Sequence, residues 1–500
     1  MAATGFHYAR RRPELTTLYE VVRDNLATLY AAADAGFASP LPGFVRSELE
    51  GYLECGLLCR GFVVMACTEP ECHARHLVAF SCKGRGFCPS CLGRRMAQTA
   101  ANLIDHVLPE QVPLRQWVLT VPFELRARLA YDAELLGGLS RELASAVMDF
   151  YRRRFELGGV RGGKSGAVTV VQRSSSDLRL NPHYHLVALD GVFTEEESAD
   201  APTFHPLPHL TSLDVAEVLQ VARVRILRFL VRKGAVVDTE PLELGAPRAQ
   251  DDGLLQLAAA AVTGHPPAGP ERRERAPVLL AERGEVRVTG PLLVSDGGFT
   301  LHAATVAGGH DPSGRESLVR YALRPPLAQE RLTRAGDDLV RIALKRPFSD
   351  GTVAVDLDPL SLLCRLVPMV PPPRFHTVRY AGVLASASRL RSRIVPQPGV
   401  TDPTEPRAPL GGSRCGWRPW AELMHRVFQL DLDRCPLCGA PMKLRALVTE
   451  PANIRRYLRH LDEATALPPR SPARDPPYFQ SAVVRRQLAQ PLPQQLPLLA

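Results

Sequence analysis

The sequence predicts an α+β protein in which a helical, cysteine-rich N-terminal region precedes a larger region with antiparallel strands. Segments with apolar residues at helical spacing alternate with short β-branched runs along the 500-residue chain. Seven of the eleven cysteines fall between positions 55 and 91. Two strand-like runs, 167–172 and 183–190, are joined by a polar turn, which predicts an antiparallel hairpin.

Composition indicates a chain that can bury a real core. Hydrophobic residues make up 45% and charged residues 23%, and the length suggests roughly two to four domains. No run of about 18 apolar residues occurs, so we expect no membrane partner. The N-terminus leads into Arg10-Arg11-Arg12 without an apolar stretch, so we expect no secretory signal and a cytoplasmic protein.

Charge gives weak support for a nucleic-acid partner. The net charge is +9 and the isoelectric point about 9.1, and 56 of the 61 basic residues are arginine. Arginine presents a planar fork that suits phosphate. A GC-rich genome produces the same arginine-rich composition, so charge alone decides little.

The expected elements follow from periodicity. Helices are predicted over 14–35, 44–58, about 91–107, 140–157 and 213–233, and strands over 117–123, 167–172 and 183–190. Residues 195–300 are rich in Pro, Gly and acidic residues, which favours an insertion near this range. From 340 to 390 short strand-like runs alternate with turns. After about residue 467 the chain lacks periodicity, which predicts a disordered tail.

The cysteine cluster predicts zinc. Cys67-x4-Cys72 is followed after fifteen residues by Cys88-Pro-Ser-Cys91. Two short-spaced pairs across a loop are typical of a four-thiolate ribbon, because tetrahedral zinc needs two turn-borne pairs. Cys82 could replace one member. The alternative is a set of buried free cysteines.

Other features near these cysteines are less specific. The basic residues around the second pair could hold DNA phosphates; they are Lys83, Arg85, Arg94 and Arg95. Cys55 and Cys59 have helical spacing, which favours core positions. Cys435-Pro-Leu-Cys438 resembles half of a second ribbon, but it lacks partners nearby in sequence, so a complete second site is not expected.

His183-Tyr184-His185 lies on a predicted strand, where residues two apart share a face. Two such imidazoles can bind one metal, with a further ligand from a neighbouring element. Structural histidines are an equally good explanation of this pattern taken alone.

Tyr321 lies on a predicted helix that Ser313-x-x-Glu316 opens as a capping box. Arg320 and Arg324 flank the tyrosine. A phenol near arginines and a metal could attack a DNA phosphate and form a phosphotyrosine. A core tyrosine is the alternative.

Residues 158–165 match the pattern of a phosphate-binding loop. Such a loop must follow a strand and open a helix, whose N-terminus meets the phosphates. Here the predicted order is helix, loop, strand, so we expect no nucleotide partner.

Five segments together resemble the rolling-circle insertion-sequence transposases of the HUH type. Three carry the motifs, namely 80–91 with the second cysteine pair, 180–193 with the histidines, and 320–326, Arg-Tyr-Ala-Leu-Arg-Pro-Pro. Segments 112–123 and 371–382 add to the likeness. It covers about 45–460 and includes the two-tyrosine group and its single-tyrosine relatives.

The resemblance implies an HUH nuclease domain with a central antiparallel sheet flanked by helices. Tyr321 would be the nucleophile, His183 and His185 would hold Mg²⁺ or Mn²⁺, and the substrates would be single-stranded DNA at transposon ends and target DNA. Arg320 and Arg324 would contact DNA. The implied domains are 1–54 helical, 55–110 zinc-binding, 111–335 nuclease, 336–466 C-terminal and 467–500 tail.

One position departs from the two-tyrosine pattern. Ser317 stands four residues before Tyr321, where those enzymes have a second tyrosine, so the chain resembles a single-tyrosine variant. Gln172 on the neighbouring strand is the candidate third metal ligand. The rival functions are a rolling-circle plasmid replication initiator or relaxase, and a non-catalytic zinc-dependent DNA-binding protein.

Overall fold

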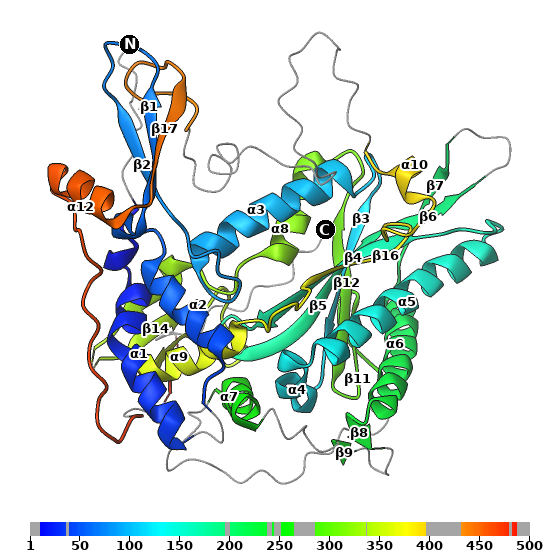
Figure 1. Cartoon of the computed structure of the whole chain (residues 1–500). Coiled ribbons are helices and arrows are strands. Elements are labelled where there is room, and N and C mark those ends of the chain that lie inside the picture. The colour runs from blue at the N-terminus through cyan, green and yellow to red at the C-terminus, as the bar shows by residue number, and fades with distance from the viewer. Residues whose placement is uncertain are drawn as a thin grey trace.

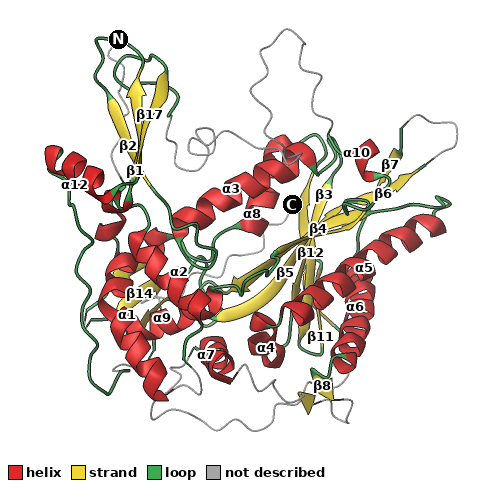
Figure 2. Ribbon diagram, in the orientation of Figure 1, coloured by secondary structure: helices red, strands yellow, loops and turns green. Residues whose placement is uncertain are grey.

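The predicted α+β class is confirmed by the computed structural model, which mixes helices with antiparallel sheets (Figures 1 and 2). The structure describes residues 11–36, 40–195, 201–237, 243–244, 252–264, 286–336, 338–396, 432–479 and 483–487. Within this part of the chain, no helix is long and apolar enough to cross a membrane.

A seven-stranded antiparallel sheet forms the centre, in the order β10-β11-β12-β3-β5-β4-β16. Its strands are β3 (Leu114–Thr120), β4 (Gly166–Ser174), β5 (Leu180–Leu189), β10 (Arg287–Gly290), β11 (Leu293–Asp296), β12 (Phe299–Ala307) and β16 (Val378–Gly382). The predicted hairpin is confirmed, since β4 pairs antiparallel with β5.

Helices cover both faces of this sheet. On one face lie α4 (Arg126–Tyr131), α5 (Ala133–Leu157) and α6 (Ser212–Arg232), and on the other α3 (Pro89–His106) and α8 (Pro312–Leu323). Side chains alternate along β5, so Tyr184 and Leu186 pack under α5 and α6, while Val187 and Leu189 pack under α3 and α8.

A second core lies beside the sheet. It is built from α1 (Thr17–Gly36), α2 (Gly43–Glu54), α9 (Pro359–Leu366) and a four-stranded sheet. The strands of that sheet are β13 (Leu332–Arg334), β14 (Val340–Ala343), β15 (Thr352–Leu357) and β18 (Val484–Gln487). Helix α7 (Asp252–Thr263) packs against α4 and α9.

A three-stranded sheet projects from this second core (Figure 1). Its order is β17-β1-β2, with β1 (Phe62–Cys67), β2 (Arg75–Ala79) and β17 (Met442–Val448). We call it the ribbon. Helix α12 (Pro451–His460) packs beneath it through Ile454 and Leu458. Smaller elements are the strands β6 (Gly191–Thr194), β7 (Thr203–Pro206), β8 (Val236–Val237) and β9 (Glu243–Leu244), and helix α10 (Arg391–Ile394).

Two sequence-based expectations need correction. Residues 287–300, assigned to an insertion near 195–300, form β10, β11 and the start of β12 in the central sheet. The tail 467–500 is not wholly without structure, because β18 pairs with β15 and Arg486 bonds the buried Asp356 at 2.7 Å. Residues 480–482 and 488–500 lie outside the described residues.

Asp190, which directly follows β5, has a structural role. Its carboxylate accepts two bonds of 2.8 Å from Arg115 and one of 2.8 Å from the Tyr151 hydroxyl. All three side chains are buried. The Arg115–Asp190 pair joins β3 to the end of β5, the strand that carries the histidines.

We expect Asp190→Ala to lower the free energy of unfolding by about 3–5 kcal/mol, because it leaves a buried guanidinium without its partner. The urea midpoint measures this. Glu156→Ala removes an exposed pair with Arg152 and should change stability by less than about 0.5 kcal/mol. Similar midpoints for the two variants would contradict the role of the buried pair.

Candidate functional site

His183 and His185 lie on the α8 face of β5, as their two-residue spacing predicts. Their rings are 4.9 Å apart, centroid to centroid. His185 is 2% exposed, and its Nε2 has no hydrogen-bond partner within the described residues. A buried nitrogen without a partner costs free energy unless something binds it.

Tyr321 stands over this pair from α8. The apolar side of α8 packs on the sheet through Leu318, Val319 and Ala322. Tyr321 lies at the margin of this apolar side, and its side chain is 48% exposed. The Tyr321 and His185 rings meet edge to face with centroids 5.8 Å apart. The structure therefore brings together the three residues expected to act together, with the phenol open to solvent.

Both histidines are neutral at pH 7. Burial, together with the nearby Arg324 and Arg126, lowers the pKa of His183 to about 4. Burial, with smaller contributions from His183 and Arg324, lowers the pKa of His185 to about 2. Neutral imidazole is the form that binds metal. Nδ1 of His183 donates to the Asn181 carbonyl at 2.7 Å, which leaves Nε2 as the ligand atom.

Gln172 lies opposite His183 in the sheet. Its Nε2 donates to the carbonyl oxygens of Tyr321 at 3.0 Å and Ala322 at 2.8 Å. These are carbonyls of the last turn of α8, where the regular helical partners run out. The Tyr321 carbonyl also accepts from the N–H of the C-cap residue, Arg324, at 3.4 Å. Gln172 thus fixes the end of the tyrosine helix, and only its Oε1 is left as a metal ligand.

Gln116 on β3 contacts the second histidine. Its side-chain Nε2 lies 3.0 Å from Nδ1 of His185, and Gln116 is 2% exposed. As placed, Nε2 of Gln116 donates to Nδ1. With the amide turned by half a rotation, Oε1 accepts from Nδ1–H instead, and this orientation leaves the Nε2 lone pair of His185 for a metal.

Asn181 shares the face of the histidines, and its Oδ1 is buried without a partner in the described residues. Among these residues no third His, Cys, Asp or Glu joins the histidine pair as a close group. The donor set therefore consists of two imidazole nitrogens with amide oxygens nearby.

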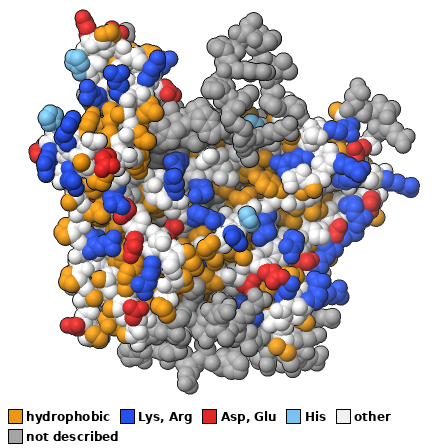
Figure 3. All heavy atoms as spheres, in the orientation of Figure 1, with side chains coloured by type: hydrophobic (Ala, Val, Ile, Leu, Met, Phe, Trp, Pro, Cys, Tyr) orange, Lys and Arg blue, Asp and Glu red, His pale blue; other side chains and the backbone are white. Residues whose placement is uncertain are grey.

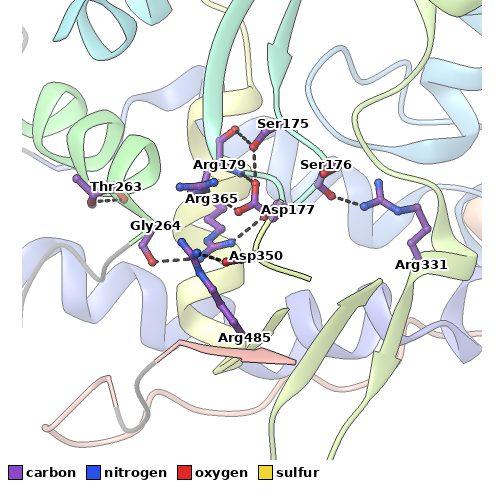
Figure 4. Close-up of polar contacts among 11 residues, drawn as sticks. Ser175, Ser176, Asp177, Arg179, Thr263, Gly264, Arg331, Asp350, Arg365 and Arg485 are labelled. Carbon is purple, nitrogen blue, oxygen red and sulfur yellow. Dashed lines mark hydrogen bonds and ion pairs between the residues drawn. The ribbon is translucent and has the colours of Figure 1, made fainter. Parts of the chain in front are cut away.

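The loop that leads into β5 is held by three arginines, of which Arg365 is buried (Figure 4). Arg365 on α9 donates to the carbonyls of Asp177 at 2.7 Å and Gly264 at 3.0 Å. Arg331 donates to the carbonyl of Ser176. Within the loop, Arg179 bonds the Asp177 carboxylate at 2.6 Å. The second core thereby fixes where the histidine strand starts.

A cavity of about 430 Å³ opens beside Tyr321, a size ordinary for ligand sites. We call it the basic pocket. Its walls come from α3, β4, the end of α8 and residues 369–378, and Gln172 and Ala322 line it. Its basic lining residues are Arg85, Arg95, Arg173, Arg324, Arg374 and His376.

Arg173 is the most buried of these cations, at 8% exposed. Its Nε and Nη2 donate to the Pro368 carbonyl at 3.2 and 2.6 Å, while Nη1 has no partner among the described residues. Its guanidinium lies 5.2 Å from the centre of the Phe375 ring. Burial lowers the pKa of Arg173 to about 10, so it stays charged at pH 7.

Positive charge is concentrated around Arg324. Its guanidinium lies over the Tyr321 ring at 4.2 Å. Burial, and then repulsion by Arg324 and Arg331, lowers the pKa of Lys345 to about 8. Burial, and then repulsion by Arg85 and Arg94, lowers the pKa of Arg95. An anion bound here would relieve this repulsion.

The expected DNA-contacting residues separate into two groups. Arg85, Arg95 and Arg324 line the basic pocket, and Arg85 also donates to the Phe375 carbonyl. Lys83, Arg94 and Arg320 lie outside it, and Arg320 pairs with Glu316 at 3.5 Å. Figure 3 shows basic side chains over the ribbon and around the middle of the face in view.

The cysteines form two groups of four instead of the expected Cys67, Cys72, Cys88 and Cys91. Cys88 and Cys91, at the start of α3, meet Cys55 and Cys82, with sulfur–sulfur distances of 3.4–3.7 Å. Cys67 and Cys72 meet Cys435 and Cys438 at the ribbon tip. Cys82 thus belongs to the group of the second pair. Cys55 is the C-cap residue of α2.

Helix α8, which carries Tyr321, does not begin with the predicted capping box of Ser313 and Glu316. Asp311 is the N-cap, and it accepts from the Gly314 N–H at 2.8 Å, with Pro312 in the first turn. An aspartate before a proline starts a helix more effectively than a serine inside it. Ser317 is exposed one turn before Tyr321.

Comparison with known proteins finds two family models. The Y2_Tnp model, described as "Putative transposase", matches residues 166–391. The Zn_Tnp_IS91 model, described as "Transposase zinc-binding domain", matches residues 28–121. The first range holds both histidines and Tyr321, and the second holds six of the eight clustered cysteines.

The chain is also similar to the transposase for insertion sequence element IS801 of Pseudomonas savastanoi pv. phaseolicola. The two are 26% identical over 405 residues, which cover 79% of this chain and 82% of that protein. No solved structure matches.

Proposed function

We propose that this chain, which belongs to the insertion-sequence transposases and carries their zinc-binding domain, nicks and rejoins single-stranded DNA through Tyr321. One observation supports this proposal most directly. The exposed phenol of Tyr321 lies 5.8 Å, centroid to centroid, from the buried imidazole of His185, whose Nε2 has no partner in the described residues.

In the proposed step, the Tyr321 oxygen attacks a DNA phosphorus in line with the bond to the 3′ oxygen. The phenol loses its proton, a phosphorus–tyrosine bond forms, and the phosphorus–3′-oxygen bond breaks. The products are a 5′-phosphotyrosine and a 3′-hydroxyl that gains a proton. The bond energy is kept, so rejoining needs no nucleotide. Arg324, stacked on the Tyr321 ring, supplies positive charge to the phenolate and the phosphate.

The donor atoms fit a divalent cation. His183 and His185 would hold Mg²⁺ or Mn²⁺ through Nε2, with amide oxygen from Asn181 or Gln172. When bound, the metal would withdraw charge from the phosphate oxygens. Gln172, through its bonds to the α8 carbonyls, keeps Tyr321 in position, and Gln116 orients His185.

The basic pocket would receive the DNA strand next to the cleaved bond. It shares Gln172, Ala322 and Arg324 with the surroundings of Tyr321, and its arginines suit phosphate. Transposon ends and target DNA would both pass through it.

A covalent adduct tests the proposed chemistry. Wild-type protein with Mn²⁺ and single-stranded DNA carrying the element's end should form an adduct that survives a denaturing gel. Tyr321→Phe, and His183→Ala with His185→Ala, should abolish it.

Ser317→Ala provides the matched control, since it removes a hydroxyl one turn away on the same helix. An adduct that persists in Tyr321→Phe would place the nucleophile elsewhere. Tight DNA binding without any adduct from the wild type would favour the non-catalytic alternative.

Gln116→Leu should weaken Mn²⁺ binding about 10–100-fold, because the partner that orients His185 is lost. Electron paramagnetic resonance of free Mn²⁺ measures the affinity, and adduct formation should recover at saturating Mn²⁺. Gln116→Glu keeps an acceptor for Nδ1–H and should bind Mn²⁺ at least as well. Unchanged affinity in Gln116→Leu would exclude the positioning role.

Arg95→Ala combined with Arg374→Ala should reduce the salt dependence of single-strand binding. The slope of log affinity against log salt should fall by about 0.7 for each DNA phosphate that the variant no longer neutralises. Arg228→Ala with Arg232→Ala removes the same charge from α6, on the opposite sheet face, and is the control. Equal slopes for the two double variants would show that the basic pocket does not bind the strand.

A further inference from the structure

The ribbon is assembled from segments near both ends of the chain. β1 and β2 form a hairpin within residues 62–79, and β17 joins the free edge of β1 in antiparallel register, with Phe62 opposite Val448 and Cys67 opposite Met442. The turn before β17 adds a bridge between Arg434 and Pro441. One end of this sheet therefore brings two turns face to face.

Each of these turns carries a cysteine pair. Cys67 and Cys72 flank the turn between β1 and β2, and Cys435 and Cys438 flank the turn before β17. Cys67 Sγ lies 3.4 Å from Cys438 Sγ, and Cys72 Sγ lies 3.7 Å from Cys435 Sγ. All four sulfurs lie within 4.8 Å of one another.

We propose that these four cysteines bind a zinc ion of their own, separate from the group of Cys55, Cys82, Cys88 and Cys91. Zinc–sulfur bonds of about 2.3 Å in a tetrahedron put the sulfurs about 3.8 Å apart. The observed distances match that spacing, whereas a disulfide needs about 2.0 Å. The transposase zinc-binding model ends at residue 121, so it contains only half of this site.

The turns are shaped as metal-binding turns. Glu69 N–H points to Cys67 Sγ at 3.4 Å, as a donor to a thiolate does. Gly439 follows Cys438 with a φ of 74°, and its N–H bonds the Cys435 carbonyl at 2.8 Å. Thr68 ties the first turn to the second through its N–H and hydroxyl, which bond the Pro441 carbonyl at 3.0 and 2.9 Å.

The ribbon tip has only a small apolar core to stabilise it. Its fully buried apolar core consists of Met65, Cys435 and Met442. Leu437, Leu444 and Leu447 are each more than 60% exposed. A small sheet with so little core is marginal in water, and zinc binding, which releases thiol protons, supplies folding free energy. Since 363 residues separate Cys72 from Cys435, the metal would close a very long loop.

Zinc content and thiol protection test this site in the full chain. Purified wild-type protein should contain two zinc ions. Cys435→Ser with Cys438→Ser should contain one. N-ethylmaleimide under native conditions, followed by mass spectrometry, should then label Cys67 and Cys72, while Cys55, Cys82, Cys88 and Cys91 stay protected.

Cys59→Ser with Cys364→Ser is the matched control, because these cysteines belong to neither group, and it should keep both ions. The wild type also gives a test that needs no variant. Cys438 is exposed, so as a free thiol it would be alkylated at once, whereas as a ligand it should react only after chelation.

One zinc ion in the wild type, two in the Cys435/Cys438 variant, or immediate alkylation of Cys438 would each overturn the proposal. These outcomes leave the tyrosine chemistry untouched, because adduct formation is measured separately.

Discussion

Strand β5 lies in the middle of a sheet covered by helices on both faces, and the alternation of its side chains assigns every residue of the strand to one layer. The even positions, such as Tyr184 and Leu186, fill the core under α5 and α6. The odd positions, His183 and His185, face the layer of α3 and α8. The two histidines can lie in this layer because α8 ends at Leu323 and does not cover them with further apolar residues. The basic pocket opens at this end of α8. The site thus depends on a sheet that cannot slip by one residue without burying its histidines in the wrong core.

Much of this arrangement is local, and the sequence predicts it for that reason. The hairpin of β4 and β5, the shared face of the histidines and the helix of Tyr321 all follow from periodicity within about twenty residues. Periodicity does not predict that the histidine strand and the tyrosine helix meet, because the 135 residues between His185 and Tyr321 have no pattern that sets the distance between these two elements. The resemblance to a family supplied that expectation.

The features that sequence analysis missed all depend on distant partners. Cys55 has the spacing of a core residue relative to Cys59, and only the fold shows that it caps α2 beside Cys82. Gln116 and Arg173 are unremarkable polar residues until their neighbours, His185 and Pro368, are known. The predicted zinc site combined cysteine pairs that are close in sequence. In the structure, the pairing of β1 with β17 instead brings Cys67 and Cys72 next to Cys438 and Cys435.

The order in which the ribbon can be built has a consequence for synthesis on the ribosome. The hairpin of β1 and β2 emerges first, and the strand that completes its sheet follows after some 363 residues. At about 5–20 residues per second, this delay is about 20–70 s. During that interval the nascent chain exposes an unpaired strand edge and two cysteines. A chain that ends before β17 would keep this open edge, which could then pair with the edge strand of another chain.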